Sequence, residues 1–177
     1  MKIGIDISQV TYEGTGVANF LGNLASNLLK SDNKNEYILF FSSLRRKIPA
    51  FVRDLGNKKN VQIKKFRFPP SLLDLLWNKL HIFPIEWLIG DVDIFVTSDW
   101  TEPPTLKAKK VTILYDLIVY KFPNETDRKI VEVQRRKLNW VKKESDMIFC
   151  ISESTKKDAM EILGVEKKRL KVIYPGI

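Results

Sequence analysis

Short apolar runs alternate with amphipathic segments along the chain. Between several of the runs, apolar residues recur every three or four positions, which is the spacing of an amphipathic helix. The apolar runs, which we expect to be strands, occupy residues 2–7, 37–41, 61–66, 92–96, 111–115, 147–151 and 171–174. The expected helices cover residues 17–28, 71–80, 126–145 and 155–163, with a further short one between residues 45 and 61. Repeated strand-helix alternation predicts an α/β fold with a doubly wound, mostly parallel, Rossmann-like sheet.

Capping residues set the expected helix boundaries. Ser71 follows a Pro-Pro step and is the expected N-cap of the helix over residues 71–80. Thr155 and Asp158 form a pair similar to a capping box at the start of the last helix. Gly164 is expected to end that helix in a left-handed conformation.

Length and composition indicate one compact domain. The chain has 177 residues, of which 44% are hydrophobic, enough for a single core. Its one cysteine, Cys150, lies in an apolar run and cannot form an internal disulfide, which suits a reducing compartment. No signal peptide begins the sequence, and no apolar run reaches the roughly 18 residues of a spanning helix. We therefore expect a cytoplasmic protein.

The chain is strongly basic. Lys and Arg number 30 against 21 Asp and Glu, giving a formal charge of +9, and the pI is near 9.6. Such a charge favours a polyanionic neighbour: phosphate, lipid headgroups or nucleic acid. The exposed face of the helix over 126–145 is expected to be strongly positive, from Arg128, Lys129, Arg135, Arg136, Lys137, Lys142 and Lys143. The basic residues are otherwise dispersed and no nucleic-acid motif accompanies them, so no nucleic-acid partner is expected.

A glycine-containing loop follows the first expected strand. Gly14, Thr15 and Gly16 precede Val17, the first residue of the expected helix. Paired glycines let backbone N–H groups approach a phosphate at the positive end of a helix. The simpler interpretation is a loop that needs a positive φ. The spacing is not the dinucleotide-binding pattern, because no third glycine follows at the required place.

Polar and aromatic side chains follow the fourth and fifth expected strands. Asp99 and Trp100 lie after one strand, and Tyr115 and Asp116 end the next. Ligands of open parallel sheets bind at the carboxyl ends of the strands. A carboxylate there can orient a sugar hydroxyl or transfer a proton, and an aromatic ring can face a sugar. The alternatives are turn capping by the aspartates and a loop-anchoring role for Trp100.

The loop after the sixth strand contains Ser152, Glu153 and Ser154, which could add hydrogen-bond donors to an anion site at the same edge. The alternative is helix capping. The one histidine, His81, has no nearby Cys or clustered carboxylates and is expected to be structural. No metal site is therefore expected.

Segments spread over nearly the whole chain carry a family resemblance. The opening segment is Gly14–Leu24, directly after Ile3–Asp6. The later segments are Asn35–Tyr37, Leu114–Leu117 followed by Phe122-Pro123, Ile151–Thr155, Leu163–Val165 and Val172–Gly176. In this order they resemble the N-terminal domain of family-four glycosyltransferases, also called group 1.

The resemblance implies one half of a GT-B architecture: residues 1–177 would be the N-terminal, acceptor-side domain, and the C-terminal donor-binding domain would be absent. It implies a retaining enzyme of hexosyltransferase type that moves a sugar from a nucleotide-sugar to a glycan or lipid-linked acceptor, without a cofactor or metal. Gly14, Thr15, Gly16 and Val17 would lie near the donor phosphates. Asp116, with Tyr115, would be catalytic.

Two departures from the family pattern affect this expectation. The family often has His-Asp where this chain has Tyr115-Asp116, so the family pattern carries over to Asp116 and not to Tyr115. The donor-binding basic residues and glutamate pair belong to the missing domain, so the 177-residue chain alone is expected to be inactive. Two alternatives stay open: a basic module that binds the inner face of an anionic membrane, and a sugar-nucleotide epimerase of the same architecture.

Overall fold

One parallel sheet organises the molecule. A computed structural model describes residues 1–175 of the chain. Within this range every strand pair is parallel, and the strand order is β3-β2-β1-β4-β5-β6-β7. The strands are β1 (Lys2–Asp6), β2 (Glu36–Ser42), β3 (Val61–Phe66), β4 (Ile94–Thr97), β5 (Lys109–Leu114), β6 (Met147–Cys150) and β7 (Leu170–Val172). The chain builds outward from β1 first in one direction and then in the other, which confirms the predicted doubly wound fold.

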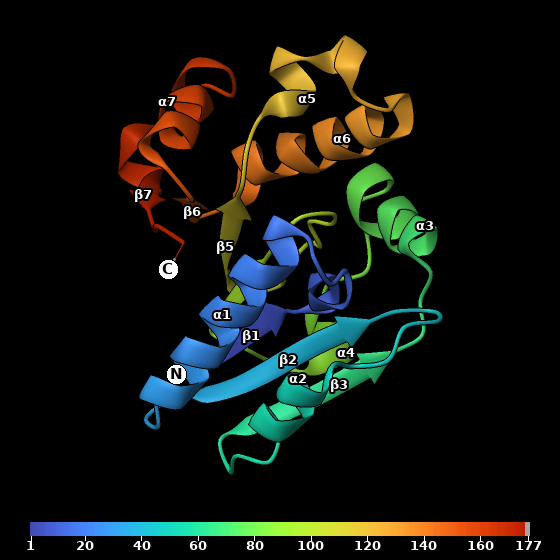
Figure 1. Ribbon diagram of the computed structural model, residues 1–177, viewed down its shortest axis with the longest axis vertical. Helices are drawn as coiled ribbons and strands as arrows, with labels where there is room; N and C mark the ends of the chain where they lie inside the picture. Colours follow the sequence, from blue (N-terminus) through green and yellow to red (C-terminus); the bar gives the residue numbers. More distant parts are fainter. Residues whose placement is uncertain (176–177) are drawn as a thin grey trace.

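Helices cover both faces of the sheet (Figure 1). The helices are α1 (Gly16–Ser31), α2 (Ala50–Leu55), α3 (Pro70–Leu73), α4 (Glu86–Ile89), α5 (Ile118–Lys121), α6 (Arg128–Glu144) and α7 (Glu153–Glu161). A π-helical segment, Asp74–Lys79, continues α3, and 3-10 turns occupy Ser8–Thr11, Pro123–Glu125 and Lys167–Arg169. The helices α1 and α2 pack on one face, against alternate residues of β1 and β2 such as Ile5 and Leu39. The opposite face, which includes Phe40, Phe95 and Ile148, packs against the α3 segment, α4, α6 and α7.

Two predicted helix caps are wrong. The N-cap of α3 is Pro69 and Pro70 is its first residue, so Ser71 lies inside the helix. Proline fits the first helical position because its missing N–H would have no helical partner there. The N-cap of α7 is Ser152, whose hydroxyl accepts the backbone N–H of Thr155 at 3.0 Å. Gly164 has φ +66° just beyond α7, as predicted.

The prediction for α6 is wrong in one residue that matters. Arg128, Lys129, Arg135, Lys142 and Lys143 are exposed, so most of the expected positive surface exists. Lys137, in contrast, is only 2% exposed and points toward the sheet. Its burial becomes important at the site described below.

Two expectations from composition, on Cys150 and on membrane-spanning helices, can be compared with the structure. Cys150 is buried, and burial raises the pKa of its thiol to about 11. In the described part of the chain, no helix is both long and apolar enough to cross a bilayer. The final strand is followed by Tyr174 and Pro175, which are exposed. Gly176, the last residue of the expected motif, lies outside the described residues.

Candidate functional site

An open groove runs along α1 at the carboxyl edge of the sheet. It has a volume of about 1200 Å³ and lies between α1 and the segment that follows β7. Figure 1 shows that segment, near the label C, beside α1. One wall consists of α1 residues that include Asn19, Phe20 and Asn23, and the floor includes Tyr115 and Asp116. The groove therefore joins two of the predicted site segments.

The glycine loop forms the end of this groove where α1 begins. Gly14 has φ +83°, which confirms that the loop needs a left-handed residue. The Thr15 side chain caps α1, accepting the N–H of Ala18 at 3.2 Å while donating to the carbonyl of Tyr12 at 2.8 Å. A Cβ added at Gly14 or Gly16 would face open space, since no atom beyond the neighbouring residues and the helix's own backbone would lie within 4 Å of it. The positive end of a helix of 16 residues is thus accessible from the groove.

Tyr115 and Asp116 point in different directions. The Tyr115 hydroxyl hydrogen bonds to Ser98 Oγ at 2.9 Å, and its ring packs edge-on against Phe20. Burial raises the pKa of Tyr115 well above its ordinary value. Asp116 is exposed, and its Oδ1 accepts the N–H of Ile118 at 3.0 Å. This turn contact uses one carboxylate oxygen of Asp116, while within residues 1–175 the other makes no hydrogen bond.

A smaller cavity of about 210 Å³ continues inward from Asp116. Asp99 and Trp100 line it together with Val17, so the groove and this cavity share Val17, Tyr115 and Asp116. Gln134 of α6 donates to the backbone and side-chain oxygens of Asp99, at 3.0 and 3.3 Å. Burial raises the pKa of the Asp99 carboxyl, although the Lys137 ammonium and Gln134 act to lower it.

Lys137 is the cation at the centre of this edge. Its ammonium donates to the carbonyl of Ser98 and interacts with the carboxylates of Glu102, Asp99 and Asp6. Burial lowers the pKa of Lys137, and the three carboxylates oppose that effect. A lysine almost never becomes this buried without charged partners. Lys137 therefore ties α6 to the segment after β4 through Ser98, and its charge also acts on Asp6 at the end of β1.

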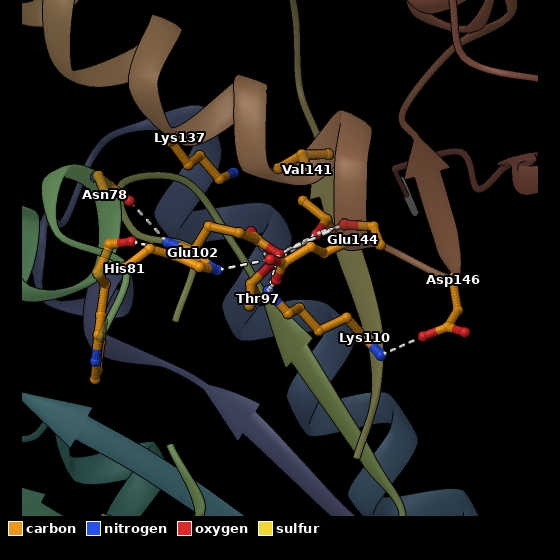
Figure 2. Close-up of polar contacts among 12 residues, drawn as sticks. Asn78, His81, Thr97, Glu102, Lys110, Lys137, Val141, Glu144 and Asp146 are labelled. Atoms are coloured by element: carbon orange, nitrogen blue, oxygen red, sulfur yellow. Dashed lines mark hydrogen bonds and ion pairs between the residues drawn. The ribbon is translucent and has the colours of Figure 1, made fainter. Parts of the chain in front are cut away.

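Glu102 anchors the loop that carries Asp99 and Trp100. Its side chain is fully buried and accepts the hydroxyl of Thr97 at 2.7 Å and that of Thr112 at 3.0 Å. Lys110 Nζ lies 3.8 Å from Glu102 Oε1 and 2.6 Å from Glu144 Oε2. Figure 2 shows Glu102 among these groups, with α6 passing above.

Asn78 extends the same network to the π-helical segment. Its side chain accepts the Glu102 N–H at 3.0 Å and donates to the Trp100 carbonyl at 2.9 Å. His81 stacks on Trp140 and contacts Glu144 at 2.9 Å, so it is structural as expected. Hydrogen bonds from Lys110 and His81 lower the pKa of Glu144, against the effect of its partial burial.

The predicted residues of the sixth loop do not join the groove. Ser152 caps α7, and the exposed Glu153 and Ser154 line neither hollow. The loop still contacts the site through Thr155, whose hydroxyl donates to the carbonyl of Tyr115 at 3.0 Å. Capping, the alternative considered from the sequence, is thus the role of Ser152.

Sequence reasoning missed Asp6, Glu102 and Lys137. Asp6 is a charged residue in a strand-length apolar run, and Glu102 directly precedes two prolines. A charged residue is unusual in either context, and this is the signal by which the sequence marks both. The spacing of Lys137 predicts its burial, because residues 134, 137, 138 and 141 lie on one face of the helix. Leu138 and Val141 on that face are apolar and buried. Among the described residues, no group of three or more His, Cys, Asp or Glu could hold a metal ion.

Comparison with known proteins identifies the fold's family. No curated protein matches the chain significantly. The model of Glycosyltransferase Family 4 matches residues 14–177, which is all of the chain except β1 and the turn after it. The parallel sheet and its flanking helices are consistent with one half of the GT-B architecture. The chain therefore belongs to glycosyltransferase family 4.

Proposed function

We propose that the chain is the acceptor-side, N-terminal domain of a retaining glycosyltransferase, which moves a hexosyl group from a nucleotide-sugar to a glycan or lipid-linked acceptor. The observation that carries the proposal is the groove in which an uncovered helix N-terminus and the exposed carboxylate of Asp116 face the same space. In the reaction, the anomeric carbon exchanges its bond to the diphosphate oxygen for one to the acceptor oxygen. The acceptor proton leaves with the nucleoside diphosphate.

The donor diphosphate would bind at the start of α1. Backbone N–H groups from Gly14 to Val17 are near the positive helix end, where an anion is stabilised. The bare Gly14 and Gly16 positions allow a phosphate to approach the backbone closely. The nucleotide-sugar is a substrate here, and the proposal requires no cofactor or metal.

Asp116 would contact the reacting sugar. Its second carboxylate oxygen can accept a hydrogen bond from a sugar hydroxyl and stabilise positive charge that develops on the sugar ring. The Tyr115 hydroxyl is already bonded to Ser98, so we assign Tyr115 to shaping the groove rather than to the chemistry. Asp99 and Trp100 would lie on the acceptor side, in the adjoining cavity.

Transfer would require a second domain. The groove is open to solvent, and a donor bound only at α1 would have water on its other face. Stabilising charge in a transition state needs groups positioned around it with water excluded. The 177-residue chain alone is expected to be inactive, with donor-binding residues supplied by a C-terminal domain.

The test compares the 177-residue chain with the longest open reading frame that contains it. Both are incubated with radiolabelled UDP- and GDP-sugars and a membrane extract as acceptor source, and the anomeric configuration of the product is determined. We expect transfer with retention by the longer protein, its loss in Asp116→Asn, and none by the short chain. Inversion, or transfer that scales with the short chain's concentration, would contradict the proposal.

A second candidate is binding to the inner face of an anionic membrane. It is favoured by the exposed lysines and arginines of α6 together with partly exposed apolar side chains nearby: Phe122 is 49% and Ile130 38% exposed. Cosedimentation with vesicles of phosphatidylcholine, with and without phosphatidylglycerol, tests it. Binding that needs the anionic lipid and weakens with salt would support this candidate, and absence of binding at low salt would exclude it.

A further inference from the structure

A separate cavity of about 240 Å³ lies where β1 and β2 end. Trp100 lines both this cavity and the one that holds Asp99. The lining combines hydroxyl groups, aromatic rings and one carboxylate, and includes Ser8, Thr11, Ser42, Tyr12, Trp100 and Asp6. Pockets for drug-sized ligands have volumes of about 300–1,000 Å³, so this one suits a single small ring.

Asp6 is the residue that makes the cavity more than a packing defect. The side chain is 6% exposed, and its Oδ1 accepts the backbone N–H of Ser8 at 2.9 Å. Burial raises the pKa of Asp6, while hydrogen bonds from Ser8 and the charge of Lys137 act to lower it. A carboxylate this buried at the carboxyl end of the first strand, and lining a cavity, indicates a ligand that donates hydrogen bonds.

The walls add the chemistry of carbohydrate recognition. The Ser8 hydroxyl accepts the N–H of Ser42 at 3.0 Å, which holds the ends of β1 and β2 together beside Asp6. The guanidinium of Arg46 lies 4.5 Å from the centre of the Tyr12 ring and donates to the carbonyl of Thr11, so its donors are partly used. Aromatic rings beside hydroxyls and a carboxylate offer a stacking face and hydrogen-bond acceptors to a polyol.

We propose that this cavity binds one neutral sugar ring of the acceptor, whose hydroxyls donate to Asp6 and whose apolar face lies against Trp100. The inference rests on the proposed function, since it names the acceptor's chemical class. A uronic acid or a phosphorylated sugar would place a second anion beside Asp6, with Glu102 also acting on that carboxylate, and would be disfavoured. A nucleotide would not fit the volume.

The experiment uses the 177-residue protein labelled with ¹⁵N, in which the indole N–H signal of Trp100 is assigned through Trp100→Phe. The probes are the methyl α-glycosides of glucose, mannose and galactose, and methyl glucuronide as the anionic match. We expect at least one neutral glycoside to shift the Trp100 signal and not that of Trp87. Methyl glucuronide should leave the Trp100 signal in place.

Asp6→Asn should weaken binding of that glycoside roughly tenfold, because a charge-assisted hydrogen bond is lost. Asp146→Asn is the matched control: Asp146 also accepts one backbone N–H, that of Lys110 at 2.8 Å, but does not line the cavity. Unchanged affinity in Asp6→Asn, or no shift of Trp100 with any neutral glycoside, would overturn the inference.

The two proposals fail separately. Transfer by the longer protein without a Trp100 shift would reject this acceptor site and leave the proposed function standing. A selective Trp100 shift without transfer from any nucleotide-sugar would do the reverse. If Asp6→Asn does not fold, the wild-type preference for neutral glycosides over methyl glucuronide decides the matter.

Discussion

Glu102, Lys110 and Glu144 form an ionic cluster, and replacing the buried Glu102 by glutamine tests whether this cluster supports the fold. The substitution keeps the size of a fully buried side chain and removes its charge. Lys110 Nζ lies 3.8 Å from Glu102 Oε1, and at an effective dielectric constant near 20 such a pair interacts by about 4 kcal/mol. Lys110 keeps its 2.6 Å contact with Glu144, so its ammonium is not left without a partner. We therefore expect Glu102→Gln to lower the free energy of unfolding by about 2 kcal/mol.

Glu102→Ala should be worse. It removes both acceptors of the Thr97 and Thr112 hydroxyls and opens a cavity, so a loss of about 3–5 kcal/mol is expected. Glutamine keeps one acceptor, and the hydroxyl of a threonine can rotate to accept from the new amide. The gap between the two variants separates the loss of charge from the loss of hydrogen bonds.

The assay is equilibrium unfolding in urea, followed by far-UV circular dichroism and tryptophan fluorescence. With a slope of about 2 kcal/mol/M, Glu102→Gln should move the midpoint down by about 1 M. Glu132→Gln is the control, because Glu132 pairs with Arg128 on the surface of α6 and should change stability by less than about 1 kcal/mol. A Glu102→Gln midpoint equal to the wild-type value, at unchanged slope, would refute this account of the cluster.

Three further predictions concern Gly14, Glu144 and Cys150. Gly14→Ala should lower the free energy of unfolding in urea by roughly 1–2 kcal/mol, because φ at this position is +83°. Gly16→Ala should leave stability nearly unchanged, because the added methyl group meets open space. In the longer protein, the same Gly16→Ala change should raise the KM for the nucleotide-sugar. The pKa of Glu144 is lowered in the folded state, so the Glu144 carboxylate stabilises the fold above its ordinary pKa of 4.5. That contribution disappears as the pH falls through the lowered pKa. The Tm difference between wild type and Glu144→Gln should therefore shrink over that acid range. The Cys150 thiol, with a pKa raised to about 11, should resist Ellman's reagent near neutral pH until the protein is unfolded by guanidinium.

The sheet could be predicted because its signal is local. Each strand is a short apolar run, and the helices between strands repeat their apolar residues at the helical period. The residues at strand ends follow from the same reasoning, since all parallel strands end at one edge. Asp116 and the Gly14 loop therefore lie on one groove, although 102 positions, from 14 to 116, separate them in the chain.

Burial of single charged residues could not be predicted in the same way. The partners of Glu102 come from β4, β5 and the end of α6, and the carboxylates whose charge acts on Lys137 lie at or after the ends of two different strands. No short window of sequence contains these contacts. Lys137 has lysines and arginines around it along the chain, so its neighbours favour the interpretation of a solvated face.

The two helix caps were predicted wrongly because more than one residue before each helix can act as the N-cap. A serine before an apolar run is a frequent N-cap, and Ser71 satisfies that rule. Pro69 and Pro70 can begin the helix two residues earlier, because proline needs no partner for an N–H it lacks. At α7, Ser152 and Thr155 are both acceptable caps by composition, and the end of β6 at Cys150 selects the earlier one.

The position of the ionic cluster connects stability to the proposed chemistry. Buried charges are weak evidence for stability, since apolar residues of equal volume often stabilise a core as well or better. This cluster lies under the loop that carries Asp99 and Trp100, and Asn78 bonds both the Glu102 N–H and the Trp100 carbonyl. Directional hydrogen bonds fix the height and rotation of that loop in a way that apolar packing would not. We therefore expect Glu102→Gln to disturb the proposed acceptor cavity as well as to lower stability, so that glycoside affinity falls even where the protein remains folded. If a folded Glu102→Gln protein bound the glycoside with unchanged affinity, as followed by the Trp100 signal, the cluster would serve the fold alone.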